Sequence, residues 1–204
     1  MSRSRAALQV LVLTVLLGGC AFRTSTLHVG YDDAKAARGP LSAVDSRRIR
    51  LEVTDRRLEP GDLIGYKRDT NHRAIAPIVA PRPAREIVQD AFAAELRKNN
   101  HVVVPDDADR FFTVSIREFW LDIQPGFWSN RYLGTAAITM VVADGRTGRA
   151  LLTREYQGNA DDSGQISREG NWEPVLNTAL ERMMRDVATD PRLVEALRTP
   201  SRLP

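Results

Sequence analysis

The residues of this sequence that could do chemistry are three histidines, some adjacent aspartates and one cysteine. His28, His72 and His101 could ligate a metal, but none has the H-E-x-x-H spacing that holds zinc on a helix. We expect these histidines to be surface or strand-edge residues. Asp106-Asp107 and Asp161-Asp162 fall in stretches that we interpret as polar turns, where no burial would raise a carboxyl pKa for acid catalysis.

Known catalytic and ligand-binding motifs are also missing. The segment from Asn159 to Gly164 begins like a calcium loop, but its twelfth position is Gly170, where a bidentate glutamate is required. The sequence contains no G-x-S-x-G elbow, Walker A loop or G-x-G-x-x-G turn. We therefore expect a protein that is not an enzyme, with no catalytic residues, no metal site and no cofactor.

The single cysteine has a different context. The N-terminus has a basic region, Ser2-Arg3-Ser4-Arg5, followed by an apolar run from Ala6 to Leu17. This run is too short for a membrane-spanning helix, which needs about 20 residues, and has the length of a signal-peptide core. It ends in Leu17-Gly18-Gly19-Cys20, which matches the bacterial lipobox. We interpret residues 1–19 as a signal peptide cleaved between Gly19 and Cys20.

In this interpretation Cys20 is the lipidation site. Its resemblance to lipoprotein signal sequences implies a diacylglyceryl thioether and an N-linked acyl chain, which together anchor a protein stably to a membrane. The following residue is Ala21, where an aspartate would commonly imply retention in the inner membrane. The expected location is therefore the outer membrane, facing the periplasm. A lipidated Cys20 also leaves no thiol for redox or catalytic chemistry.

A second cluster is typical of binding. The connection from Gln124 to Tyr132 contains Phe127, Trp128, Arg131 and Tyr132, and aromatic and arginine side chains are typical of interface hot spots. We expect an exposed hairpin connection that binds a partner through these four residues. The alternative is that Phe127 and Trp128 fold back and cover the edge of the sheet.

Composition limits the possible partners. The 204 residues contain 29 Lys and Arg against 26 Asp and Glu, and removing residues 1–19, with Arg3 and Arg5, leaves 27 bases. A net charge near zero argues against nucleic acid, which requires clustered bases. We interpret Arg47-Arg48 and Arg56-Arg57 as solvated faces. The length fits one domain with a sizeable core.

Periodicity predicts the fold class. We expect residues 20–48 to be the lipidated cysteine and a flexible tether, and residues 49–204 to be a single periplasmic domain. Alternating or β-branched segments predict strands at Ile49–Thr54, His101–Val104, Phe111–Ile123, Leu133–Ala143 and Ala150–Tyr156, with a further candidate at Ala74–Val79. A polar segment, residues 158–171, follows the last strand.

Helical spacing of apolar residues predicts helices at Ala84–Lys98 and Trp172–Val187, and Pro191 opens a short final helix. Asn99 and Asn100 are suited to ending the first of these helices, and Glu95 is placed on its polar side. The second helix has a methionine-containing stripe that we expect to pack on the sheet, although it could instead bind a partner helix. The prediction is an α+β fold, a mostly antiparallel sheet with two main helices on one face, in the order β-α-β-β-β-β-α.

Several segments together resemble the YajG family of bacterial lipoproteins over most of the mature chain. They are the lipobox, Val53-Thr54-Asp55-Arg56-Arg57, Leu63-Ile64-Gly65, His101-Val102-Val103 and Asp186-Val187-Ala188-Thr189-Asp190-Pro191-Arg192-Leu193. The Phe127-Trp128 connection and the arginines at 56 and 57 depart from the family pattern. The resemblance implies an envelope lipoprotein with no established catalytic residues.

These observations favour an outer-membrane-anchored periplasmic lipoprotein that is not an enzyme and binds another protein of the cell envelope. One alternative is an auxiliary lipoprotein of an envelope transport system for lipid or solute, which would need an apolar cavity between helices and sheet. Another is a cell-wall hydrolase. The sequence leaves the partner and the oligomeric state open.

Overall fold

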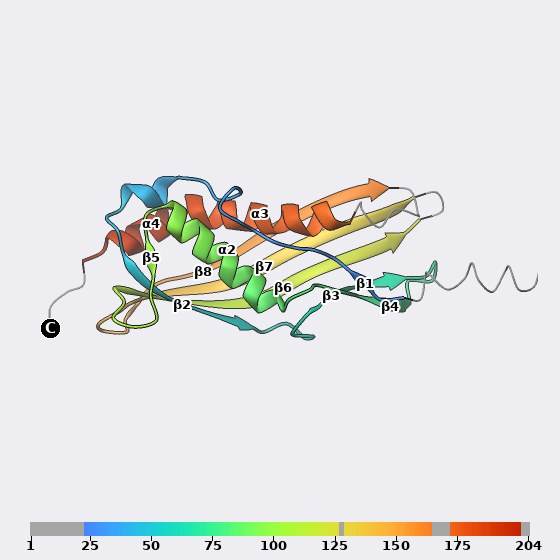
Figure 1. Cartoon of the computed structure of the whole chain (residues 1–204), viewed down its shortest axis with the longest axis horizontal. Helices are drawn as coiled ribbons and strands as arrows, with labels where there is room; N and C mark the ends of the chain where they lie inside the picture. The colour runs from blue at the N-terminus through green and yellow to red at the C-terminus, as the bar shows by residue number, and fades with distance from the viewer. Residues whose placement is uncertain (1–22, 127–128, 165–171, 201–204) are drawn as a thin grey trace, which may run out of the picture.

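The structure, a computed structural model, describes residues 23–126, 129–164 and 172–200 (Figure 1). Its elements are β1 (Ser25–Thr26), the 3-10 helix η1 (Pro40–Ala43), β2 (Arg48–Asp55), β3 (Leu63–Arg68), β4 (Ala74–Val79), α2 (Ala84–Lys98), β5 (Val102–Val103), β6 (Arg110–Pro125), β7 (Asn130–Asp144), β8 (Ala150–Gly164), α3 (Glu173–Thr189) and α4 (Pro191–Arg198). The described strands form one sheet of eight, with the helices on one face (Figure 1). The predicted α+β class is confirmed.

Strand β6 holds the sheet together. One edge of β6 pairs antiparallel with β7 over its whole length, and β7 pairs antiparallel with β8. The other edge of β6 has two parallel partners, β2 along Arg110–Ile116 and β3 at Leu121–Asp122. The three longest strands are thus antiparallel, as predicted, whereas shorter pairings such as β2 with β5 and β1 with β4 are parallel.

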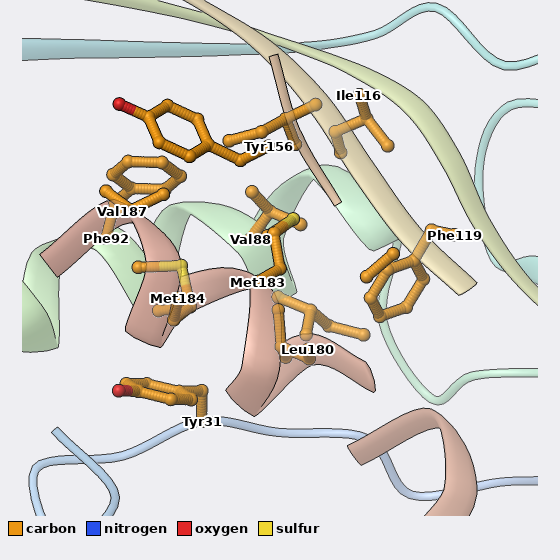
Figure 2. Close-up of a cluster of buried hydrophobic side chains, with 14 of the residues drawn as sticks. Tyr31, Val88, Phe92, Ile116, Phe119, Tyr156, Leu180, Met183, Met184 and Val187 are labelled. Atoms are coloured by element: carbon orange, nitrogen blue, oxygen red, sulfur yellow. The ribbon is translucent and has the colours of Figure 1, made fainter. Parts of the chain in front are cut away.

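The core lies between this sheet and the helices. Leu180, Met183 and Met184 of α3 are fully buried beside Phe92 of α2, so the methionine stripe packs inside the domain (Figure 2). Glycine allows α3 to lie this close to the sheet. A Cβ atom at Gly158 of β8 would lie only 2.0 Å from the carbonyl oxygen of Ala179. Any side chain at this position would push the helix away from the sheet.

The predicted helices are confirmed. Helix α2 covers the predicted 84–98, and α3 begins one residue after Trp172. Asn100 follows α2 with a φ of 66°, the left-handed conformation expected at a helix end. The final helix after Pro191 is α4.

The predicted strand boundaries need two corrections. Strand β8 continues to Gly164, so Asn159 and the Asp161-Asp162 pair lie in a strand and not in a polar loop or turn. Strands β1 and β3 were absent from the predicted order, and β4 confirms the candidate strand at Ala74–Val79. Periodicity failed for β1 and β3 because both are short and β3 contains Gly65, Lys67 and Arg68.

The predicted tether is wrong for its described part. Residues 23–47, which we name the strap, run across the helices (Figure 1). The strap buries six apolar side chains, those of Leu27, Val29, Tyr31, Ala36, Leu41 and Val44. These side chains belong to the same hydrophobic cluster as α2 and α3. Residues 23–47 are therefore part of the folded domain, and no flexible spacer precedes β2 within the described residues.

Hydrogen bonds fix the strap to both helices. The hydroxyl of Tyr31 donates to Glu95 Oε2 of α2 at 2.7 Å, and the amide of Gly39 donates to Asn99 Oδ1 at 2.9 Å. The amide of Gly30 donates to Asn177 Oδ1 of α3 at 3.0 Å. Glu95 is consequently 2% exposed, although its spacing placed it on the polar side of α2. Burial beneath the strap raises the pKa of its carboxyl group.

Candidate functional site

A buried ion pair shapes the loop between β2 and β3. The guanidinium of Arg57 donates to both carboxylate oxygens of Asp55, at 2.9 and 2.7 Å, in the bidentate geometry that arginine favours. It also donates to the carbonyl oxygens of Gly61, Leu63 and Phe119. The two side chains are 5% and 9% exposed. Arg57 is therefore a buried anchor of the loop, which corrects its interpretation as part of a solvated face.

The same bonds set the charge state of Asp55. Burial alone would raise the pKa of this carboxyl group, but hydrogen bonds from Arg57 and from the amide of Gly61 outweigh that effect. The pKa of Asp55 therefore lies below its ordinary value. A carboxylate held ionised against a buried arginine supports the loop and is not available as a general acid.

The anchored loop presents a large apolar side chain to solvent. Leu58 is 102% exposed, directly after the buried Arg57. Beside it lies a cleft of about 330 Å³. The cleft is lined by Arg57, Leu58, Glu59, Arg117, Glu118, Phe119 and Trp120. The Trp120 ring contacts Tyr66 edge-on, with centroids 5.8 Å apart, and the Tyr66 hydroxyl donates to Glu59 at 3.2 Å. We name Leu58, Glu59, Tyr66, Arg117, Glu118 and Trp120 the Trp120 surface.

A β-bulge in β6 builds this surface. The pairing of β6 with β7 shifts register between Ile116 and Glu118. Ile116 and Phe119 both point into the core, so the two residues between them, Arg117 and Glu118, are both exposed. Bulges re-aim side chains in this way and are frequent next to functional sites. The bulge also lies where the partner of β6 changes from β2 to β3.

The residues predicted as sites are placed differently. Gly19, Cys20, Phe127 and Trp128 lie outside the described residues. Arg131 is exposed and pairs with Asp161 at 3.2 Å. Tyr132 is 2% exposed and stacks on Trp172, with ring centroids 6.2 Å apart, so its expected place in an exposed connection is wrong. Strand β7 begins at Asn130 and points Tyr132 into the core.

A larger groove of about 610 Å³ lies between the strap and the helices, with His28, Asp32, Arg82 and Asp90 among its lining residues. Arg82 and Asp90 form an ion pair at 2.7 Å. Within the described residues no three His, Cys, Asp or Glu side chains are placed to hold a metal. No described helix combines the length and the apolarity needed to cross a membrane.

His28 and His72 are exposed, as expected. His101 directly precedes the edge strand β5, but it is 3% exposed beneath the strap, so a surface position is wrong for this histidine. Its Nδ1 accepts from the Arg47 amide at 3.2 Å, so Nε2 carries the proton and donates to the Leu41 carbonyl, also at 3.2 Å. Burial lowers the pKa of this imidazole, and the charge of Arg47 adds to the effect. The native state therefore holds His101 neutral.

This burial predicts acid sensitivity. Between the lowered native pKa and the unfolded value of about 6.5, the unfolded chain binds more protons, so stability falls as the pH falls below about 6.5. The slope should approach, at most, about 1.4 kcal/mol per pH unit. Urea midpoints at pH 7.5, 6.5 and 5.5 measure it. His101→Gln should flatten this slope, whereas the exposed His72→Gln should not, and an equal slope in all three proteins would refute the assignment.

Several proteins of solved structure are similar to the chain at low sequence identity. A Xanthomonas campestris protein of solved structure is similar at 12% identity, with 85% of this chain and 93% of that chain covered and a TM-score of 0.49. A Neisseria meningitidis lipoprotein has 12% identity, coverage of 69% and 98%, and a TM-score of 0.37. A minor lipoprotein of Acinetobacter baumannii has 13% identity, coverage of 71% and 92%, and a TM-score of 0.38.

A comparison with curated protein sequences finds no match to the chain, whereas a family model does match it. A family model described as uncharacterized lipoprotein matches residues 41–198, which covers the domain from η1 to the end of α4. The chain therefore belongs to this family of lipoproteins.

Proposed function

We propose that this lipoprotein is of the YajG type, is anchored to the outer membrane through lipid on Cys20, faces the periplasm, and binds another protein of the cell envelope through the Trp120 surface. In this proposal it is not an enzyme. The lipobox and Ala21 support the anchor and its location. The observation that carries the binding function is the fully exposed Leu58 beside a Trp-lined cleft.

Rigidity supports a binding role for Leu58. The side chain projects from a loop whose base is tied by five hydrogen bonds from Arg57 to Asp55, Gly61, Leu63 and Phe119. A side chain presented by a fixed loop loses little loop entropy when a partner covers it, and such preorganisation favours affinity. A large apolar side chain with no structural task is more informative than a scattered surface leucine, because here it borders an aromatic cleft.

The chemistry of the surface describes the partner. Trp120 and Tyr66 offer aromatic area, while Arg117 is one of the residue types enriched at hot spots. Glu59 and Glu118 add negative charge at the rim of the same cleft. The partner we propose is a protein segment with an apolar side chain that enters the cleft, flanked by polar groups that match both signs of charge.

In-cell crosslinking tests this proposal. A photoreactive amino acid at position 58 should give one dominant adduct with an envelope protein, identified by mass spectrometry. The same amino acid at position 102 is the matched control, because Val102 is another exposed apolar residue, 51% exposed, on strand β5. Identical adducts from both positions, or none from 58, would refute the assigned surface.

Substitution at the same position separates binding from folding. Leu58→Asp should reduce partner capture by about 30-fold, the effect of losing a hot spot worth about 2 kcal/mol. The free energy of unfolding should change by less than about 0.5 kcal/mol, because the wild-type side chain is exposed. Val102→Asp should leave capture unchanged. A large loss of stability in Leu58→Asp would show that Leu58 has a structural role.

A further inference from the structure

The path of the strap fixes where the chain enters the domain. Strand β1 pairs parallel with β4, with Ser25 opposite Ile78 and Thr26 opposite Val79. Followed backwards from Ser25, the chain therefore runs along β4 towards Ala74. Lys67 Nζ donates to the Arg23 carbonyl at 3.0 Å, which holds residue 23 beside β3 as well. The direction of approach is thus towards the β3–β4 turn, residues 69–73.

This turn lies at one end of the long sheet. Strand β3 runs parallel to β6, with Tyr66 opposite Asp122, so both strands point to the same end, where β6 stops at Pro125. Strand β7 begins there and β8 finishes there, since Asn130 pairs with Gly164 (Figure 1). We name Arg23, the turn 69–73 and the adjoining ends of β6, β7 and β8 the entry end. The opposite end carries the β7–β8 turn, residues 145–149.

Chain length then limits how far the entry end can move from the lipid. Ser25 lies five positions after Cys20, and this length of chain spans at most about 18 Å when fully extended. Strand β7 alone has 15 residues, which corresponds to about 50 Å. The opposite end, which carries the β7–β8 turn and which we name the far end, can contact the lipid in place of the entry end only if the strap detaches from the helices. That exchange would expose Leu27, Val29 and Tyr31, which the fold buries.

The charges at the entry end suit a lipid headgroup surface. Arg23, Lys67, Arg68 and Arg73 gather there, and the Arg73 side chain is 75% exposed. Asp122 pairs with Arg68 at 3.0 Å and Asp69 pairs with Arg73 at 2.8 Å, so Arg23 and Lys67 supply the positive charge beyond these two pairs. Asp162, near the end of β8, is an exposed acid at the same end. Bases near the membrane surface are attracted to anionic headgroups.

We propose that the entry end rests on the phosphate headgroups of the membrane, with the long axis of the domain pointing away from the lipid. This inference rests on the proposed lipid at Cys20. It deepens the proposed function, because it states which surface of the domain the membrane occupies. The Trp120 surface, on β3, β6 and their neighbouring loop, then remains at the side of the domain and accessible to a partner.

Depth-dependent quenching tests the orientation. The full-length lipidated protein is placed in vesicles of phosphatidylethanolamine and phosphatidylglycerol that contain a headgroup-spin-labelled lipid. Lipidation uses the natural thiol, so Asn71→Cys in the entry-end turn, or Arg146→Cys at the far end, gives a single site for a fluorophore. Both positions are exposed. We expect the label at 71 to lose at least half of its fluorescence and the label at 146 to lose less than a tenth.

A longer segment between Cys20 and the domain is the matched control. Ten glycine and serine residues inserted before Arg23 should reduce the quenching at 71 at least twofold, because the domain can then leave the lipid surface. Equal quenching at 71 and 146, or stronger quenching at 146, would overturn the orientation while leaving the anchor and the partner intact. Quenching at neither position would overturn it as well.

Radiolabelled palmitate in the same cells separates this failure from that of the proposed function. Incorporation into the wild type and not into Cys20→Ser supports the anchor independently of orientation. Equal incorporation into both proteins, or none into either, would remove the anchor and with it the proposed orientation. Crosslinking from position 58 would still report on partner binding in that case.

Discussion

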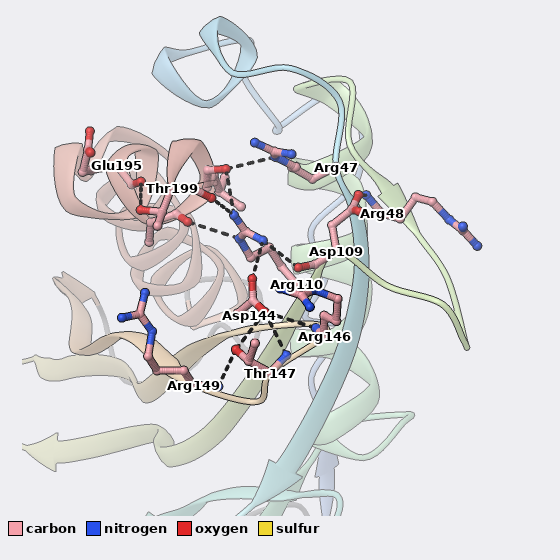
Figure 3. A network of polar contacts seen from close by, with 12 residues as sticks. Arg47, Arg48, Asp109, Arg110, Asp144, Arg146, Thr147, Arg149, Glu195 and Thr199 are labelled. Atoms are coloured by element: carbon pink, nitrogen blue, oxygen red, sulfur yellow. Dashed lines mark hydrogen bonds and ion pairs between the residues drawn. The ribbon is translucent and has the colours of Figure 1, made fainter. Parts of the chain in front are cut away.

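Replacing Arg110 by Ala is expected to lower the free energy of unfolding by about 3–5 kcal/mol, the usual result of breaking a buried charge pair from one side. Arg110 is fully buried at the start of β6. Its guanidinium contacts Asp144 at 3.5 Å and donates to the carbonyls of Asp109 and of Ala196, Leu197 and Thr199 at the end of α4 (Figure 3). Guanidinium denaturation at neutral pH measures the loss.

The reason for the size of this effect is the number of buried groups that lose a donor. A cation at a helix C-terminus is favourable because the last carbonyls carry partial negative charge. Without Arg110 the carbonyls of Ala196 and Thr199 would lose this donor, whereas the Leu197 carbonyl would keep the Arg47 Nε donor at 2.9 Å. The buried Asp144 would lose the positive charge that faces it. Asp144 also accepts from the amides of Arg146 and Thr147, so the β7–β8 turn would be strained with it (Figure 3).

Two variants show whether the hydrogen bonds of the Arg110 guanidinium are responsible for the loss of stability. Arg110→Lys keeps the charge but offers fewer donors in another geometry, and should recover only a minor part of the stability. Arg149→Ala, an exposed arginine of the neighbouring turn, should change the unfolding free energy by less than about 0.5 kcal/mol. If Arg110→Ala resembled Arg149→Ala, the network would contribute little to the fold.

Replacing Leu41 by Ala should cost about 2–5 kcal/mol, as truncations of buried leucines do. Leu41 belongs to η1 of the strap and is 1% exposed within the main hydrophobic cluster. For a domain of this size the melting temperature should fall by about 2–4 °C per kcal/mol. A flexible tether would give no change, so thermal unfolding of this variant distinguishes a strap from a tether.

Ser46→Ala is the matched control in the same segment, because Ser46 is exposed. It should leave the melting temperature within about 2 °C of the wild type. Equal melting temperatures for Leu41→Ala, Ser46→Ala and the wild type would mean that residues 23–47 do not stabilise the domain in solution.

Local periodicity was sufficient for the parts of the fold that are long and regular. The apolar spacing in 84–98 and 172–187 predicted α2 and α3 closely, since each helix buries one continuous stripe. The strap had only a short signal of this kind. Leu27, Val29 and Tyr31 alternate with less buried neighbours over just five residues, and the buried residues that follow, Ala36, Leu41 and Val44, are irregularly spaced. They contact elements that come later in the chain, and only those elements reveal their role.

Buried polar residues were the second source of error. The residue types of Glu95, His101 and Arg57 predict exposure, and each is buried because a distant segment supplies its partner. Tyr31 lies 64 positions from Glu95, and the Phe119 carbonyl lies 62 positions from Arg57. Composition and spacing along the chain carry no information on such pairings.

The sequence predicted the residue types of the candidate site but not its position in the fold. Aromatic and arginine residues were expected to form a binding surface, but the described cluster lies at Leu58 and Trp120 and not at Arg131 and Tyr132. Its assembly requires the bulge at Ile116–Glu118, which has no signature in an otherwise regular strand. The one available signal was Trp120 itself. Because a shift of one residue moves a side chain to the other face of a strand, the bulge decides that Trp120 faces outward.

The two-residue strand β1 also determines how the domain would respond to force. Tension on an anchored Cys20 would pull Arg23 along the axis of β1, and the amide of Leu27, bonded to the Val79 carbonyl at 2.8 Å, would be sheared together with the pairing before it. Bonds loaded in shear must yield together, whereas bonds that are peeled yield one at a time. The domain would therefore act as a mechanical coupling, in which tension on the anchor is transmitted through β1 to the sheet.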